Sequence, residues 1–165
     1  MSVSVEPVGG TPSAALLALN QEDAGHLSDL DAAGLSRLSG MAFMAARIGE
    51  ADALLIAFDQ DADYRSPNFL WFRERYRRFV YVDRVVVAGH ARGRGLARSL
   101  YAALFARAEA AGHARVVCEV NADPPNPGSD AFHAAMGFEP VGTGTPSPNK
   151  QVRYLLRNLG LEPSR

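Results

Sequence analysis

The sequence predicts a mixed α/β fold with one central sheet. Residues 79–87 are β-branched or aromatic at nearly every position, which is typical of a strand. Residues 95–111 repeat leucine every four positions, which is typical of a helix that buries one face. Residues 116–120 form another short apolar run. Because a strand, a helix and a strand follow one another, we expect a crossover connection over residues 79–120.

The first third of the chain predicts shorter elements. Residues 1–13 contain two glycines and two prolines, so we expect an irregular arm there. Residues 14–19 are apolar and predict a short first strand. Residues 20–38 space their leucines roughly as a helix does, which predicts one or two short helices.

A strand pair and a polar stretch precede the clearest strand. Residues 41–47 and 53–58 predict two strands joined by a turn that contains Gly49. Residues 59–68 are polar and predict a loop. Residues 69–72, Phe-Leu-Trp-Phe, follow it and are unusually apolar for a loop.

The last third of the chain continues the alternation. Gly112 follows the long helix where a left-handed cap is expected. Asn126 and the proline after it are typical of a helix start, and Gly137 is where that short helix should end. Residues 138–141 and 152–156 predict closing strands.

Composition narrows the class of protein. The chain is 47% apolar and 21% charged, and 165 residues fit a single domain, so we expect one domain over residues 1–165. A formal net charge of -1 argues against a nucleic-acid binder. Cys118 is the only cysteine, and no apolar run is long enough to span a bilayer. We therefore expect a cytoplasmic protein that is not embedded in a membrane.

The turn at residues 92–97, Arg-Gly-Arg-Gly-Leu-Ala, carries the main functional signal. It opens the long helix, where free backbone N–H groups and the helix dipole favour an anion. Gly93 and Gly95 allow close approach to a phosphate and positive φ. No Lys-Ser/Thr pair follows, as a P-loop requires, and Arg98 occupies the third small position of the dinucleotide fingerprint. The alternative is a glycine-containing turn that binds no ligand.

Two motifs resemble those of the GCN5-related N-acetyltransferase (GNAT) superfamily. Val85-x-Val87 followed by residues 92–97 resembles its cofactor-binding motif. The next motif is similar to the downstream set Asn126, Ser129, His133 and Gly137-Phe138, except that the superfamily usually has tyrosine at the place of His133. The arrangement of a further set of residues resembles that in a group of uncharacterised predicted bacterial acetyltransferases within this superfamily. The set comprises Tyr64, Ser66, Asn68 and Trp71.

The resemblance implies a fold and a cofactor. It implies a mixed, mostly antiparallel sheet of about six or seven strands, splayed between strands 4 and 5 and flanked by helices. Acetyl-CoA would bind in the splay, with its pyrophosphate on the backbone of the turn and its pantetheine arm along the strand before it. The implied cofactor-binding residues are Val85, Val86, Val87, Arg92, Gly93, Arg94, Gly95, Leu96, Ala97, Asn126 and Ser129.

Acetyl transfer to an amine needs a base, because a lysine-type amine is protonated at neutral pH. Asp83 is the first candidate, since it shares strand parity with Tyr81 and Val85. Glu119, on the facing strand, is the competitor. For either acid the alternative role is an ion pair with a nearby arginine, and ordered water is an alternative base.

His133 is the candidate acid for the departing thiolate, because a histidine titrates near neutral pH. Packing beside Phe132 is its alternative role, and Tyr101 is a less favoured acid. Cys118 would permit an acetyl-cysteine intermediate, but a thiol in an apolar strand is more often a core residue. No metal is expected, since the remaining histidines lack ligand spacing: His26, His90 and His113.

The acceptor is the least determined part of the prediction. The candidate substrate-binding residues are Tyr64, Asn68, Trp71 and Tyr81. Aromatic groups interleaved with arginines fit a pocket for a small-molecule or peptide amine, or the face of a homodimer. The predicted function is direct acetyl transfer from acetyl-CoA to a primary amine. The alternatives are a non-catalytic acyl-CoA sensor and an RNA-binding module that uses the Arg-Gly-Arg-Gly run.

Overall fold

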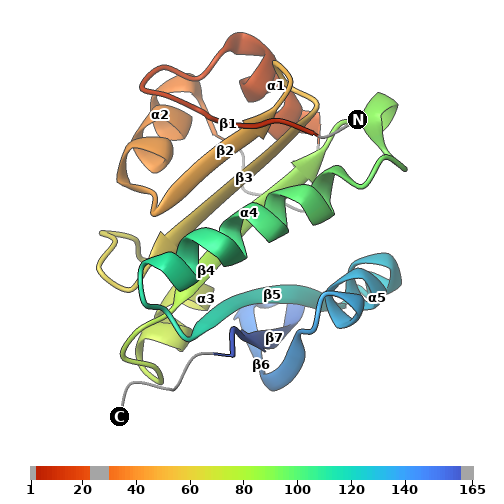
Figure 1. Ribbon diagram of the computed structural model, residues 1–165. Helices are drawn as coiled ribbons and strands as arrows, with labels where there is room; N and C mark the ends of the chain where they lie inside the picture. Colours follow the sequence, from red (N-terminus) through yellow and green to blue (C-terminus); the bar gives the residue numbers. More distant parts are fainter. Residues whose placement is uncertain (1–2, 23–29, 161–165) are drawn as a thin grey trace.

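The computed structural model describes residues 3–22 and 30–160, and their centre is a seven-stranded sheet (Figure 1). The strands are β1 (Val5–Pro7), β2 (Met44–Ile48), β3 (Ala53–Asp59), β4 (Val80–Val87), β5 (Arg115–Asp123), β6 (Glu139–Ser147) and β7 (Lys150–Asn158). The helices are α1 (Ala14–Glu22), α2 (Ala32–Met41), α3 (Pro67–Arg73), α4 (Leu96–Ala110) and α5 (Pro127–Ala135), with a short 3-10 turn at Gly89–Ala91.

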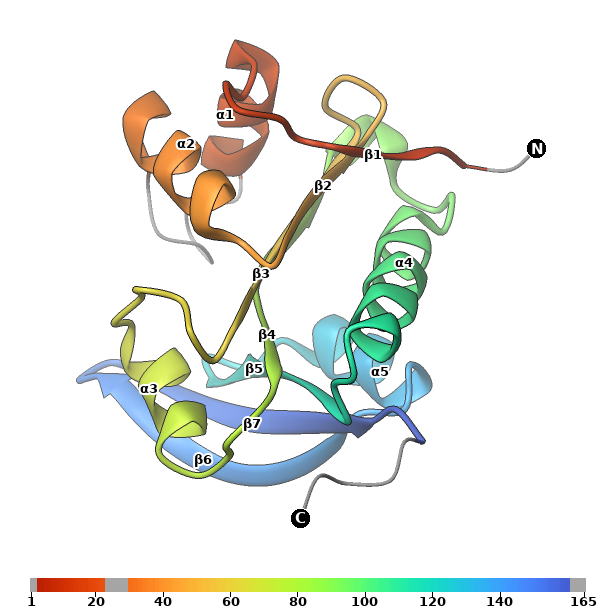
Figure 2. The same ribbon diagram turned by 60° about the vertical axis from the view of Figure 1, so that its left-hand side comes forward.

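The sheet divides into two parts between β4 and β5. Its order is β1-β2-β3-β4-β5-β7-β6, and every neighbouring pair is antiparallel except the parallel pair β4–β5. That pair is joined only where Val80 faces Val116 and Tyr81 faces Val117. Beyond these residues the strands separate, and Figure 2 shows β3 and β4 rising away from the curved group of β5, β6 and β7. The predicted splay between strands 4 and 5 is confirmed.

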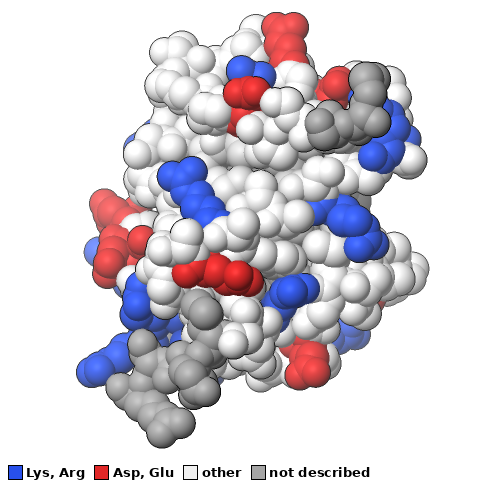
Figure 3. All heavy atoms as spheres, viewed as in Figure 1, with Lys and Arg blue, Asp and Glu red and all other residues white. Residues whose placement is uncertain are grey.

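Helices cover both faces of the part of the sheet formed by β1–β4. Figure 2 shows α1 and α2 on one side of β1–β4 and α4 on the other, while α5 lies near the end of β5. Because both faces of β3 are covered, its residues 53–58 are all buried. Helix α4 buries Leu96, Leu100 and Leu104, the leucines that predicted it. On the face seen in Figure 3, basic and acidic side chains are interspersed rather than gathered.

Several predicted elements are confirmed. The strand pair β2–β3, the strand β4, the long helix α4 and the short helix α5 all lie where the sequence placed them. The side chain of Asn126 accepts a hydrogen bond from the Ser129 amide, which is the expected N-cap of α5. Strands β5, β6 and β7 are longer than predicted. No described helix has the length and apolar character needed to cross a membrane.

Two predictions near the N-terminus are wrong. Residues 14–19 belong to helix α1 rather than to a strand, because alanine and leucine favour a helix and the Ser13 hydroxyl accepts from the Leu16 amide at its start. The first strand is instead β1, inside the arm that was expected to be irregular, where it pairs with β2. Part of the predicted helical stretch, including His26, lies outside the described residues.

The apolar stretch at residues 69–72 is helical rather than a loop. Ser66 caps α3 by accepting a hydrogen bond from the Phe69 amide, and Pro67 occupies its first turn. Phe69 and Phe72 are fully buried against the sheet. The serine–proline pair was the sequence signal for this helix.

Candidate active site

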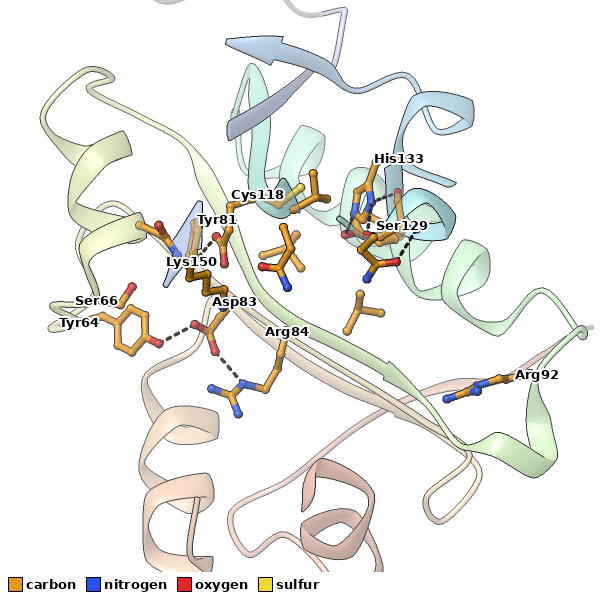
Figure 4. Close-up of a pocket in the computed structure, with 18 residues that line it drawn as sticks. Tyr64, Ser66, Tyr81, Asp83, Arg84, Arg92, Cys118, Ser129, His133 and Lys150 are labelled. Carbon is orange, nitrogen blue, oxygen red and sulfur yellow. Dashed lines mark hydrogen bonds and ion pairs between the residues drawn. The ribbon is translucent and has the colours of Figure 1, made fainter. Parts of the chain in front are cut away.

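A cavity of about 530 Å³ lies where β4 and β5 separate. Residues from six helices and strands and from three connecting loops line it, and Figure 4 shows their side chains converging on the gap in the sheet. The three candidate catalytic residues, Asp83, Glu119 and His133, all face this cavity. The fold therefore brings the three predicted catalytic residues to one cavity.

Glu119 is a partly buried carboxyl on β5. The Tyr81 hydroxyl donates a hydrogen bond of 2.7 Å to its Oε1 atom, and no other side chain contacts Oε2 within hydrogen-bonding distance among the described residues. Burial raises the pKa of Glu119 to about 7, although the bond from Tyr81 acts in the opposite direction. Glu119 can therefore exchange a proton near neutral pH.

Each carboxylate oxygen of Asp83 accepts a hydrogen bond from a different neighbour. Arg84 Nε donates to Oδ2 at 2.7 Å, and the Tyr64 hydroxyl donates to Oδ1 at 2.5 Å. Arg84 also donates to Asn20 Oδ1 at 2.8 Å, which connects the pair to helix α1. Both ion-paired side chains are almost inaccessible to solvent. Asp83 thus has the ion-pair role that was its alternative, in addition to its position in the cavity.

His133 uses both of its ring nitrogens. Its Nδ1 atom lies 2.8 Å from the carbonyl oxygen of Ser129, which can only accept, so Nδ1 carries the proton. The Tyr101 hydroxyl, 2.8 Å away, then donates to Nε2. Burial lowers the pKa of His133, which favours this neutral form. The histidine therefore joins α5 to α4 through Tyr101, a contact between distant segments that sequence reasoning missed.

Cys118 lies next to Glu119 in β5 but is only 2% exposed. Burial raises the pKa of its thiol well above the ordinary value, so the thiolate is strongly disfavoured. The described residues contain no group of three or more histidine, cysteine or acidic side chains that could hold a metal.

The predicted anion-binding turn forms a second cavity of about 370 Å³ at the start of α4. Gly93 and Gly95 have φ values of 80° and 72°, and a Cβ atom built on either glycine would meet nothing within 4 Å. None of the described side chains caps this end of α4, so its first amides are available to a ligand. Arg92 lines both cavities and thus connects the turn with the splay.

The other predicted cofactor residues divide between the two cavities. Val85, Asn126 and Ser129 line the first, whereas Val87, Leu96 and Ala97 line the second. Val86 is buried on the opposite side of β4, and Arg94 is exposed outside both linings. A backbone role for residues 85–87 and 92–97 is compatible with this arrangement.

The predicted acceptor residues are brought to the first cavity with one exception. Tyr64, Asn68 and Tyr81 line it, but Trp71 does not and is instead stacked on Tyr154 with ring centroids 4.1 Å apart. The Tyr154 hydroxyl donates a 2.9 Å hydrogen bond to Asn68 Oδ1. Lys150, which was not predicted as a site residue, also lines the cavity.

Comparison with known proteins identifies a family and a fold. The model of a family described as the Acetyltransferase (GNAT) family matches residues 48–138, more than half of the chain. A search of curated proteins finds no significant match.

Solved acetyltransferases share the fold at low sequence identity. The ribosomal-protein-S18-alanine N-acetyltransferase of Escherichia coli is 14% identical, with a TM-score of 0.72, and the alignment covers 99% of this chain and 98% of that one. The putative acetyltransferase yncA of Salmonella typhimurium, solved with its cofactor acetyl-CoA, is 15% identical, with a TM-score of 0.73 and coverage of 100% and 98%. A putative acetyltransferase of the GNAT family from Desulfovibrio desulfuricans is 13% identical, with a TM-score of 0.70 and coverage of 96% and 100%.

Proposed function

Because this chain belongs to the Acetyltransferase (GNAT) family, we propose that it transfers an acetyl group directly to a primary amine within a ternary complex. Family membership makes it an acetyl-CoA-dependent acetyltransferase, and acetyl-CoA supplies the acetyl thioester. The direct route and the amine acceptor are the proposal. The observation that carries it is the Glu119 carboxyl, which faces the splay with a pKa of about 7.

The residues of the turn fit the cofactor. A pyrophosphate needs several backbone donors and room for close approach, and the uncapped start of α4 with Gly93 and Gly95 offers both. Arg92 and Arg98 line the same cavity and add positive charge. We assign the pyrophosphate to this turn and the pantetheine arm to the β4 side of the splay.

Glu119 is the proposed general base. An acceptor amine arrives mostly protonated at neutral pH, and a carboxylate with a pKa near 7 can accept its proton without being trapped in the ionised form. Tyr81 orients this carboxylate through its hydrogen bond. We prefer Glu119 to Asp83 because both oxygens of Asp83 already accept hydrogen bonds.

Direct transfer is preferred to a covalent route through Cys118. The buried thiol, with its raised pKa, is a poor nucleophile at neutral pH. His133 is assigned a positioning role, since its Nδ1 proton is donated to Ser129 and its Nε2 atom accepts from Tyr101. These contacts leave no ring proton directed at a leaving thiolate.

The relatives span different acceptors. One is described as acting on an alanine of ribosomal protein S18, and another as a putative phosphinothricin N-acetyltransferase. Their names support an amine acceptor, either a peptide or a small molecule, without selecting between them.

The test is release of free CoA thiol from acetyl-CoA in the presence of a panel of primary amines. Glu119→Gln should lower kcat by about 10²–10⁴ while the protein still binds acetyl-CoA, because it removes only the base. Asp123→Asn, an exposed carboxyl on the same strand, is the matched control and should keep full activity. Absence of thiol release with every amine, or full activity in Glu119→Gln, would contradict the proposal.

A further inference from the structure

Lys150 is the only lysine in the sequence, and its side chain lines the cavity. It is the first residue of β7, directly after the turn from β6, and it is only partly exposed. Figure 4 shows it among the cavity side chains, together with Tyr81 and Asp83. No hydrogen bond or ion pair with another described residue engages its ammonium group. A cation held in this way is available to a ligand.

The two other cations of the cavity already have different roles. Arg84 is paired with Asp83 and bonded to Asn20. Arg92 stands on the turn that we assign to the cofactor. Lys150 is therefore the cation that the acceptor side of the cavity can offer.

Asn68 provides a second donor on the same side. Its Oδ1 atom accepts from the Tyr154 hydroxyl, so its amide NH₂ is directed elsewhere, and no described residue accepts a hydrogen bond from that group. Asn68 lines the cavity, and its Nδ2 atom is not among the fully buried atoms that lack a partner. The tyrosine thus fixes Oδ1 as the acceptor and leaves the NH₂ group of this cavity-lining residue without a partner among the described residues.

The strand register relates these donors to the proposed base. Tyr154 and Lys150 are four residues apart on β7 and so share one face of it, and Tyr154 faces Glu119 across the β5–β7 pair. Burial raises the pKa of Glu119, and the positive charge of Lys150 acts against this rise. An acceptor held by its amine at Glu119 can extend toward Lys150.

We propose that Lys150 and the Asn68 amide form a subsite for a carboxylate, so that the acceptor is an amino acid or a similar small amine that bears a carboxylate. This inference rests on the proposed function. Two donors match the two oxygens of a carboxylate. A doubly charged phosphate fits less well, because Asp83 and Glu119 place acidic groups in the same cavity.

The first experiment compares acceptors that differ only at the carboxylate. Phenylalanine, phenylalaninamide and 2-phenylethylamine form one set, and leucine, leucinamide and 3-methylbutylamine form another. At least one free amino acid in a wider panel of such sets should have a kcat/KM about tenfold or more above its amide and its amine. The amide is the stringent comparison, because its amine is more readily deprotonated than that of the acid.

The second experiment assigns the preference to Lys150. Lys150→Met keeps the length of the side chain and removes its charge. At a pH where Glu119 is ionised in both proteins, kcat/KM should fall about tenfold more for the amino acid than for its amide. Lys150→Arg should retain most of the preference. Gln151→Met, on the neighbouring exposed residue, is the matched control and should behave as the unmodified protein does.

The outcomes separate this inference from the proposed function. Equal turnover of acids, amides and amines, or an equal effect of Lys150→Met on all three, would overturn the carboxylate subsite. Acetylation of Lys150 itself, detected by mass spectrometry after incubation with acetyl-CoA alone, would also overturn it. No turnover of any amine would contradict the proposed function instead. In that case, calorimetric titration of N-acetylphenylalanine into CoA-saturated protein tests the subsite without turnover. Binding that is lost in Lys150→Met supports the subsite, whereas no binding, or binding that Lys150→Met leaves unchanged, rejects it.

Discussion

At the scale of the residue, the proposed role of Glu119 as the base predicts how activity depends on pH. Burial raises its pKa to about 7, and only the ionised form can accept a proton from the amine. We therefore predict that kcat/KM falls as pH drops through about 7 and levels off above it. A pH–rate profile with an acceptor whose own ionisation is known would measure this.

Tyr81 offers a check on the origin of that dependence. Its hydrogen bond to Glu119 favours the ionised carboxylate, so Tyr81→Phe should raise the pKa of Glu119 further and move the profile to higher pH. If the pH–rate profile does not move in Tyr81→Phe, the ionisation belongs to another group. The same conclusion follows if the midpoint of the profile lies near the ordinary pKa of a carboxyl.

At the scale of the element, Tyr101 and His133 join α4 to α5. The Tyr101 hydroxyl is buried, and in His133→Phe it loses its acceptor, which should cost about 1–3 kcal/mol of unfolding free energy. Tyr101→Phe should also be destabilising, because Nε2 of His133 then loses its donor. Because the double variant leaves neither polar group unpaired, it should cost less than the sum of the two single changes. Denaturant unfolding of the four proteins measures this coupling.

The same variants test whether His133 is more than a link between helices. His133→Gln keeps a side-chain acceptor, so it should retain more stability and more activity than His133→Phe. If kcat instead fell by about 10² or more in both variants, with folding intact, His133 would be acting as the acid for the thiolate.

The turn before α4 makes a prediction about cofactor binding. Gly95→Asp places a carboxylate where the pyrophosphate is expected, so the thermal stabilisation given by acetyl-CoA should disappear. Gly9→Asp is the matched control: Gly9 also has positive φ, 82°, and open space for a Cβ atom, but it lies in the N-terminal arm. Loss of the stabilisation in both variants would point to backbone strain rather than to the site.

Some elements could be predicted from the sequence and others could not. The turn at residues 92–97 could be singled out in the sequence because an anion-binding helix start depends only on local backbone conformation and helix polarity. Helix α1 was mistaken for a strand because a short apolar run has no clear period, and β1 is a strand of only three residues that depends on its partner β2. Lys150 could not be assigned to the site, because the β6–β7 turn and the splay are brought together only by the fold.

At the scale of the whole molecule, the divided sheet leaves one strand edge open. β4 pairs with β3 from Val80 to Val87, whereas it pairs with β5 only at Val80 and Tyr81. The remaining backbone groups on the β5 side of residues 82–87 have no strand partner in the part of the chain that the structure describes. A pantetheine arm that pairs with this edge would supply one, so acetyl-CoA should order β4 in addition to the turn.

Hydrogen exchange measures this effect directly. Acetyl-CoA should slow exchange in a peptide that covers residues 82–87 and in the turn at 92–97, while β2, which already has partners on both sides, changes little. CoA should act almost as well, since it keeps the same arm, whereas ATP and NAD should protect neither segment. At a concentration of about 100 Kd, acetyl-CoA or CoA should add about 2.7 kcal/mol to the free energy of unfolding. Protection confined to the turn would show that the pyrophosphate binds there while the arm follows another route, and equal protection by ATP would remove the specificity for CoA.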